Sequence, residues 1–294
     1  MVQKEGVVYI GDLLNYNPNN NYRVKYPGSS TTSIYGPDYI DNGNYRLVGS
    51  YENENDTTVY GLFFQGTLLD LENSNNYKTI NIGLTFTFVH STIENILVGN
   101  YDQSYLGPIQ AFLMIIDTGK IINISYPGAR SNTLYGVWYD GDGNYTLCGG
   151  YSYLDVNVNQ VYVKNIIKPF GLAFMVNYNI KTNEFKNWTT FNYPYLNNGI
   201  LSNNVLTHFE GISSSEKNKY QLATDTIFLD KIITSYVEVS KDKFNNFIVS
   251  KWIDFSYPLP GIIQSSSNSV AKNSIVGTYF DKENSSTAFQ LEIE

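Results

Sequence analysis

The chain contains two histidines, and one of them stands two residues before a glutamate. His208 and Glu210 belong to the segment "LTHFEG". Residues two apart on an extended strand point to the same face, so the imidazole and the carboxylate would lie side by side. Imidazole titrates near neutral pH and can act as an acid, a base or a metal ligand, and the carboxylate could orient it or act as an acid itself. This pair therefore has the chemistry of a proton-transfer site.

The chain also contains an internal repeat, in which the second histidine, His90, falls in the same strand of its repeat as His208 and Glu210 do in theirs. The segment "SYPGARSNTLYGVWYDGDGNYTLCGGY" (125–151) repeats "KYPGSSTTSIYGPDYIDNGNYRLVGSY" (25–51), with Tyr, Pro, Gly and Asn at the same places. Self-similarity of this kind is the signature of repeat architectures. Five related strand-like segments end at Tyr51, Tyr101, Tyr151, Thr226 and Tyr279.

Each repeat contains four strand-like segments. In the first repeat they are "TSIYG", "NYRLVGSY", "TVYGLFFQGTL" and "YKTINIG". Four antiparallel strands in about 50 residues are typical of a β-propeller blade. The sequence therefore predicts an all-β, five-bladed β-propeller in a single domain, 1–294. A β-solenoid would need shorter rungs, and a pair of β-sandwiches would not explain five copies of one unit. The repeats run over about 29–82, 83–128, 129–194, 195–258 and 259–294, the last completed by 1–28.

The two chain ends are expected to share the last blade. The fifth repeat ends after its third strand, and "GVVYIGDLLNYNPNNNYRVKYPG" near the N-terminus reads like a third and a fourth strand. We predict that "YRVKYPG" supplies the missing outer strand and closes the ring. However, "VVYIGDL" and "TAFQLEI" both look like third strands of that blade. One of them could be displaced, extend the sheet or pair with another subunit, so an oligomer is left open.

The repeats differ most at one position of the inner strand. Inner strands crowd around the axis of a propeller, so the residue after this position should be small, and it is: Gly36, Ser91, Gly136, Gly211 and Ser269. The variable residue before it would face a central channel. Because the polar residues at this position differ from repeat to repeat, they indicate one shared site rather than five copies of the same site. The five variable residues are Tyr35, His90, Tyr135, Glu210 and Asn268.

We predict a role for each of these residues. His90, His208 and Glu210 are the candidate catalytic residues, and the same three could bind Zn²⁺ or Fe²⁺. Tyr35 and Tyr135 could stack on a ring or bond an oxygen, and Asn268 could donate to a developing oxyanion. Ser91 and Ser269 would complete the ligand contacts. We expect no required cofactor and leave open a divalent metal in the channel. Each histidine alone could equally be a strand residue bonded to neighbouring backbone.

Other candidate residues are weaker. "YDGDGNY" (139–145) starts like a calcium loop but lacks the glutamate at the twelfth position, so we interpret it as a hairpin turn. Asp225 could be a second acid, but we favour a turn residue at a strand end. A glycosidase needs two placed carboxylates, and with Glu210 alone that class is weakened. Cys148 lies in an apolar strand and is expected to be a small buried hydrophobe.

Composition excludes some partners. The net charge is −8 and no basic run occurs, which argues against a nucleic-acid backbone or an anionic membrane surface. No apolar run approaches a membrane span. "MVQKEGVVYIGDLL" lacks the apolar core of a signal peptide, so the protein is expected to be cytoplasmic or exported after loss of a leader.

The repeats themselves resemble a known group. "YGPDYIDNGNYRLVGSY", "YGVWYDGDGNYTLCGGYS" and "THFEGISS" look like the units of an uncharacterised group of bacterial repeat proteins, from which no activity follows. The architecture is also similar to the five-bladed propellers of invertase-like glycosidases and of tachylectin-type lectins. This is an analogy of fold, and a fold does not determine a function.

Two functions therefore stay open. The first is a central polar pocket for a small polar or aromatic molecule, with hydrolase or lyase chemistry by His90, His208 and Glu210. The second is a non-catalytic, lectin-like module that binds glycans or proteins through its Tyr- and Asn-rich surface loops. The unequal residues at the axis favour the first.

Overall fold

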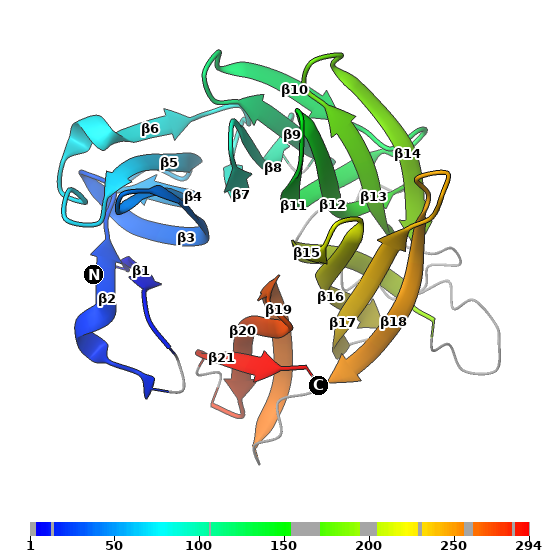
Figure 1. Cartoon of the computed structure of the whole chain (residues 1–294). Helices are drawn as coiled ribbons and strands as arrows, with labels where there is room; N and C mark the ends of the chain where they lie inside the picture. The colour runs from blue at the N-terminus through cyan, green and yellow to red at the C-terminus, as the bar shows by residue number, and fades with distance from the viewer. Residues whose placement is uncertain are drawn as a thin grey trace. The chain divides into compact units, whose positions relative to one another are not determined.

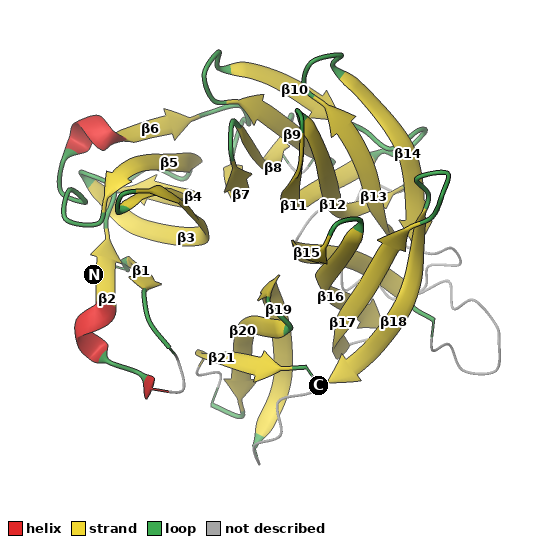
Figure 2. Cartoon of the chain, in the orientation of Figure 1, coloured by secondary structure: helices red, strands yellow, loops and turns green. Residues whose placement is uncertain are grey.

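The fold is all-β, and its described residues form five consecutive antiparallel blades and a separate two-stranded sheet near the N-terminus (Figure 1). This confirms the predicted class, the five-bladed β-propeller. Figure 2 shows strands nearly everywhere and only short helical turns. No helix among the described residues is long and apolar enough to cross a membrane. The structure is a computed structural model, and it describes residues 4–12, 15–105, 107–153, 171–194, 205–228, 231–255, 261–283 and 286–293.

The first compact unit, Met1–Ile124, contains two blades and an N-terminal hairpin. The first blade has the strand order β3-β4-β5-β6 and the second has the order β10-β9-β8-β7. The strands are β1 (Gly6–Tyr9), β2 (Asn21–Val24), β3 (Ser29–Asp41), β4 (Asn44–Asn53), β5 (Val59–Thr67), β6 (Tyr77–Ile80), β7 (Thr87–Ile93), β8 (Ile96–Asp102), β9 (Ile109–Ile115) and β10 (Lys120–Ile124); single turns η2 (Pro18–Asn20) and η3 (Ser74–Asn76) precede β2 and β6.

The second compact unit, Ser125–Glu294, contains the third, fourth and fifth blades. Their strand orders are β11-β12-β13-β14, β15-β16-β17-β18 and β19-β20-β21. The strands are β11 (Ser131–Gly141), β12 (Asn144–Ser152), β13 (Leu172–Asn179), β14 (Glu184–Phe191), β15 (Val205–Glu216), β16 (Lys219–Phe228), β17 (Lys231–Lys241), β18 (Phe247–Phe255), β19 (Ile262–Ala271), β20 (Ser274–Asp281) and β21 (Ser286–Glu292).

Asparagine, aspartate and glycine form the tight turns between the inner two strands of a blade. In the β11–β12 turn, Asp142 has φ 52° and Gly143 has φ 75°. The β3–β4 turn has Asn42 at 47° and Gly43 at 79°. Two successive residues with positive φ match the twist of a two-residue hairpin, and these residue types tolerate that backbone. The hairpin interpretation of "YDGDGNY" is therefore confirmed.

The core of the second unit lies between consecutive sheets. Cys148 and Met175 of the third blade belong to the same buried cluster as Phe209 and Leu222 of the fourth blade. Each of these side chains is fully buried. Cys148 is thus the small buried hydrophobe that was predicted, and burial raises the pKa of its thiol. Burial of apolar surface between sheets is the main driving force that stacks them.

The N-terminal hairpin covers the first blade in the same way. β1 and β2 pair antiparallel, with Gly6 opposite Val24. Val8 and Val24 belong to one buried cluster with Leu47 and Phe64 of the first blade. The hairpin therefore packs against the first blade as the third blade packs against the fourth. This agrees with its resemblance to the third and fourth strands of a repeat.

The fifth blade has three strands among the described residues, with β21 following β20. Both "VVYIGDL" and "TAFQLEI" thus form strands, β1 and β21. Closure of the ring by an N-terminal strand and the use of a spare strand in an oligomer stay predictions, as does the single domain.

Glycines lie where one inner strand passes close to the next. A Cβ added to Gly36 would lie 2.8 Å from the carbonyl oxygen of His90. A Cβ added to Gly211 would lie 2.9 Å from Cα of Ser269. Real Cβ atoms do not approach backbone this closely, so the small residues predicted after each variable position are a packing requirement.

Replacing Gly211 by alanine should destabilise the second unit, because the new methyl group meets backbone that cannot move aside. We expect a loss of about 1–3 kcal/mol in the free energy of unfolding, measured by denaturant titration. Gly119→Asn is the control. Gly119 has φ 67° and open space around it, so this change should stay within about 0.5 kcal/mol. Equal effects of the two substitutions would contradict the packing argument.

Candidate functional site

His208 and Glu210 lie side by side on β15, the inner strand of the fourth blade. A hydrogen bond joins Nε2 of His208 to Oε1 of Glu210. Their side chains are 17% and 16% exposed, so the pair is largely, but not completely, removed from solvent. The spacing of two residues correctly predicts that they point the same way. A partly exposed pair of this kind can still contact a ligand.

Gly150 on β12 lies where β15 passes close by at His208. A Cβ at this position would lie 2.8 Å from Cβ of His208 and 3.5 Å from its Cα. The equivalent residue of the first blade is Ser50, so this difference between the two long repeats falls at a close approach of two blades. Tyr135 of β11 adds an aromatic wall, with its ring centroid 5.5 Å from that of His208 and the rings tilted by 30°.

Asp225 lies directly opposite His208 in the register of β15 and β16. Its side chain is buried, with 3% of the residue exposed. Ser266 Oγ donates a hydrogen bond of 2.6 Å to it, and Ser267 donates from its backbone nitrogen at 3.0 Å and from Oγ at 2.9 Å. The carboxylate thus connects the fourth blade to β19 of the fifth.

The interpretation of Asp225 as a turn residue was therefore wrong. The residue belongs to β16, and the turn before it is formed elsewhere. Its only signal in the sequence was an acid at a place where the other repeats have Ser50, Asn100, Gly150 and Thr278. Nothing in that comparison shows that three donors from the neighbouring strand would be present, because those donors come from the next blade.

The surroundings shift the proton affinity of both ionisable partners. Burial raises the pKa of Asp225 to about 6, and the negative charge of Glu210 adds to the rise, while bonds from Ser266 and Ser267 oppose it. For His208, burial lowers the pKa, but the charge and hydrogen bond of Glu210 and the charge of Asp225 outweigh it, so the pKa is raised. His208 therefore retains its proton to higher pH than an exposed histidine does.

β19 passes beside β15 just after Glu210. A Cβ at Gly211 would lie 3.2 Å from the carbonyl oxygen of Asn268, as well as close to Ser269. The backbone at Asn268 and Ser269 is thus adjacent to this part of β15. Their role as ligand contacts stays a prediction.

The first unit holds a separate aromatic cluster around His90. The ring of Tyr35 on β3 lies 5.2 Å from that of His90 on β7, and Phe88 lies 6.1 Å from His90. The Tyr35 hydroxyl bonds Oγ of Ser50 at 2.9 Å, and burial raises its pKa. Ser91 follows His90 where β7 passes Gly36. A site shared by His90 and His208 stays a prediction.

Among the described residues, no group of three or more His, Cys, Asp or Glu side chains is arranged to hold a metal ion. The carboxylates of "YDGDGNY" are bonded to protein groups instead: Lys241 lies 3.1 Å from Asp140, and Lys181 pairs with Asp142. The metal predicted at His90, His208 and Glu210 stays untested.

The stability of the protein should fall as pH rises through the titration of Asp225. Its pKa rises from 3.8 in the unfolded chain to about 6 in the folded state, so the folded state holds more protons between these values. Titration of Asp225 should therefore lower the free energy of unfolding by about 2 kcal/mol from pH 4 to pH 7, and Asp225→Asn should remove this contribution. Denaturant titrations across this range measure it.

Asp117→Asn, on an exposed turn, is the control and should reproduce the wild-type profile. Parallel pH profiles for wild type and Asp225→Asn would show that the buried carboxyl does not titrate as described.

The sequence matches no family model and no curated protein. Among solved structures, the chain is similar to the GH43 endo-arabinanase from Bacillus licheniformis, with a TM-score of 0.45 and 10% identity over 92% of this chain and 96% of that one. An arabinanase from Bacillus subtilis has a TM-score of 0.43 and 8% identity over 88% of this chain and 93% of that one. The β-propeller domain of the trilobed protease from Pyrococcus furiosus has a TM-score of 0.38 and 10% identity over 90% of this chain and 82% of that one.

Similarity at this level transfers neither a substrate nor a reaction to this chain. The resemblances to an uncharacterised bacterial group, to invertase-like glycosidases and to tachylectin-type lectins are not confirmed by these comparisons.

Proposed function

We propose that this β-propeller binds a small polar molecule and acts on it by acid–base chemistry at His208 and Glu210. The observation that carries the proposal is the direct bond between these two partly exposed side chains beside a buried third ionisable group, Asp225. Perturbed ionisable groups gathered at one place are a mark of functional sites.

The structural alternative is that His208 is an ordinary strand residue with a satisfied imidazole. Two features speak against it. Asp225 is buried although its charged form is unfavourable there. Burial of ionisable groups costs stability, and the residues equivalent to His208 in the other blades are all uncharged: Ser33, Phe88, Thr133 and Ser266.

The chemistry that we propose divides the roles between the two side chains. His208, with its raised pKa, donates a proton to the oxygen of a leaving group through the ring nitrogen that Glu210 does not hold. Glu210 accepts a proton from an attacking water in a hydrolase, or from a carbon acid in a lyase. Asp225 is a positioning residue, because its oxygens bond Ser266 and Ser267 and it is buried.

The remaining predicted residues take supporting places in this proposal. Tyr135 beside His208 would form an aromatic wall for the ligand. Asn268 would stabilise negative charge on a reacting oxygen, next to Ser269. The first-unit residues His90, Tyr35 and Ser91 stay candidates for the same site. The chemistry at His208 and Glu210 needs no cofactor, and a divalent metal would be an addition to it.

The substrate should be neutral and carry a bond to a leaving oxygen, as in a glycoside or an ester. The net charge of −8 disfavours anionic substrates. A lectin-like module without catalysis is the second function that the sequence leaves open, and one experiment separates the two.

Glu210→Gln should abolish turnover, because it removes the carboxylate but retains the volume. We expect kcat/KM to fall by about 10²- to 10⁴-fold on whichever substrate the wild type hydrolyses in a panel of nitrophenyl glycosides and esters. His208→Ala should give a similar loss.

Glu216→Gln is the matched control, since this glutamate is exposed at the end of the same strand. It should keep full activity, and all three variants should unfold at a similar denaturant midpoint. Wild-type turnover in Glu210→Gln would refute the proposed chemistry, and ligand binding without turnover in the wild type would establish the lectin-like alternative.

A further inference from the structure

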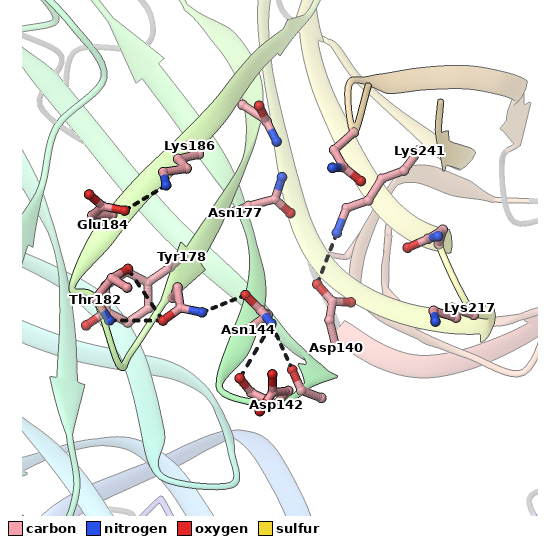
Figure 3. A pocket seen from close by; sticks show the side chains of 15 residues that line it. Asp140, Asp142, Asn144, Asn177, Tyr178, Thr182, Glu184, Lys186, Lys217 and Lys241 are labelled. Atoms are coloured by element: carbon pink, nitrogen blue, oxygen red, sulfur yellow. Dashed lines mark hydrogen bonds and ion pairs between the residues drawn. The ribbon is translucent and has the colours of Figure 1, made fainter. Parts of the chain in front are cut away.

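A pocket of about 620 Å³ opens at the turns of the third and fourth blades (Figure 3). Its walls come from four turns, those that join β11 to β12, β13 to β14, β15 to β16 and β17 to β18. None of the catalytic candidates lines it. Its size is that of a site for a small ligand, but its lining is polar rather than apolar.

One part of the lining is a buried lysine. The side chain of Lys241 is 8% exposed, and its Nζ lies 3.1 Å from Asp140 Oδ2 and 3.2 Å from Thr146 Oγ1. Nζ also lies 5.0 Å from the centroid of the Tyr220 ring. An ammonium group has three N–H donors, and these two oxygens use two of them. The third donates to no oxygen or nitrogen atom of the described residues, and Nζ also lies 5.2 Å from the centroid of the Phe247 ring.

A half-buried amide lies next to this lysine. Oδ1 of Asn177 on β13 lies 3.3 Å from Thr146 Oγ1, the same oxygen that Lys241 contacts. The single proton of that hydroxyl is donated to Asp140 Oδ2 at 2.6 Å. The amide nitrogen of Asn177 bonds none of the described residues. Asn177 lies beside the register shift between β13 and β14. Lys241 and Asn177 together offer donors at one place in the pocket.

Further amides surround these donors. The side chains of Asn187, Asn218 and Asn245 also line the pocket and bond none of the described residues. Their φ angles are 58°, 64° and 63°, a backbone that asparagine and glycine both tolerate. Asn218 and Asn245 lie between strands, and Asn187 lies within β14 where its register with β13 shifts. The backbone at these places therefore explains why a residue of this type is present, but it would accept glycine equally well. Each amide adds a donor and an acceptor.

The charges around the pocket are balanced. Lys186 Nζ lies 2.7 Å from Glu184 Oε2, and Lys241 pairs with Asp140. With three positive and three negative side chains the formal charge is 3 − 3 = 0, so the lining has no net charge to attract an ion. The six are Lys186, Lys217, Lys241, Asp140, Asp142 and Glu184.

We infer that this pocket binds a neutral, hydroxyl-rich ligand, a short oligosaccharide. Neighbouring hydroxyls of a sugar both donate and accept, as the amides do, and they need no net charge in the site. The lysine N–H and the Asn177 amide would bind sugar oxygens at the bottom, and the amides of the turns would bind hydroxyls above. The inference does not depend on the proposed function, since the two sites share no residue.

The test removes the amides and retains the turns. The double variant Asn218→Gly/Asn245→Gly deletes two side chains where glycine adopts the same positive φ. The matched control is Asn42→Gly/Asn55→Gly, because these asparagines are exposed, have φ 47° and 65°, and lie in the first unit. Asn177→Ala is the second probe of the site. The ligands are cellopentaose, xylopentaose and chitopentaose, and binding is measured by saturation-transfer NMR and calorimetry.

We expect at least one pentaose to bind the wild type, and the double variant and Asn177→Ala each to weaken it by about tenfold or more, the cost of one to two lost hydrogen bonds. The control should bind as the wild type does. Three results would overturn the inference: no binding of any pentaose to the wild type, equal binding by the site variants and the control, or loss of binding in His208→Ala alone.

Discussion

The close approach of inner strands is the constraint on which the rest of this structure depends. Glycine stands where β15 passes β19, and any side chain there would meet backbone. The sheets can bury Cys148, Phe209 and their neighbours only when the strands come this close. The same approach brings Asn268 beside Glu210 and the serines beside Asp225. Packing and site geometry therefore have one cause.

The ionisable groups of the fourth blade work against the stability of that packing. Asp225 is buried with a pKa raised to about 6, and Glu210 and Asp225 raise the pKa of His208 against the effect of burial. Serine hydroxyls and a backbone N–H offset part of the cost of burying Asp225. Such an arrangement is poorer in stability than an apolar one, and it gives an acid and a base at one place.

The second unit thus has two polar regions of different character. At the inner strands, three ionisable groups lie close together, and the pKa values of Asp225 and His208 are both raised. At the turns, amides and paired charges form a neutral surface around a pocket. The first arrangement suits proton transfer, and the second suits recognition of hydroxyls. A propeller can contain both polar regions because the contacts between blades depend on the inner strands, while the residues of the turns can vary without disturbing those contacts.

The sequence alone determined the fold class, the hairpin turns and the crowded glycine positions, because all three follow from local patterns repeated along the chain. It also placed His208 and Glu210 on one face, since strand periodicity settles that within three residues. Only the tertiary structure decided the role of Asp225 and the close approach of Gly150 to His208. Their partners lie 41 residues and more away in neighbouring blades, and no local pattern records which side chain of one sheet will face which strand of the next. The pocket at the turns has the same origin, since it exists only where four separate turns meet.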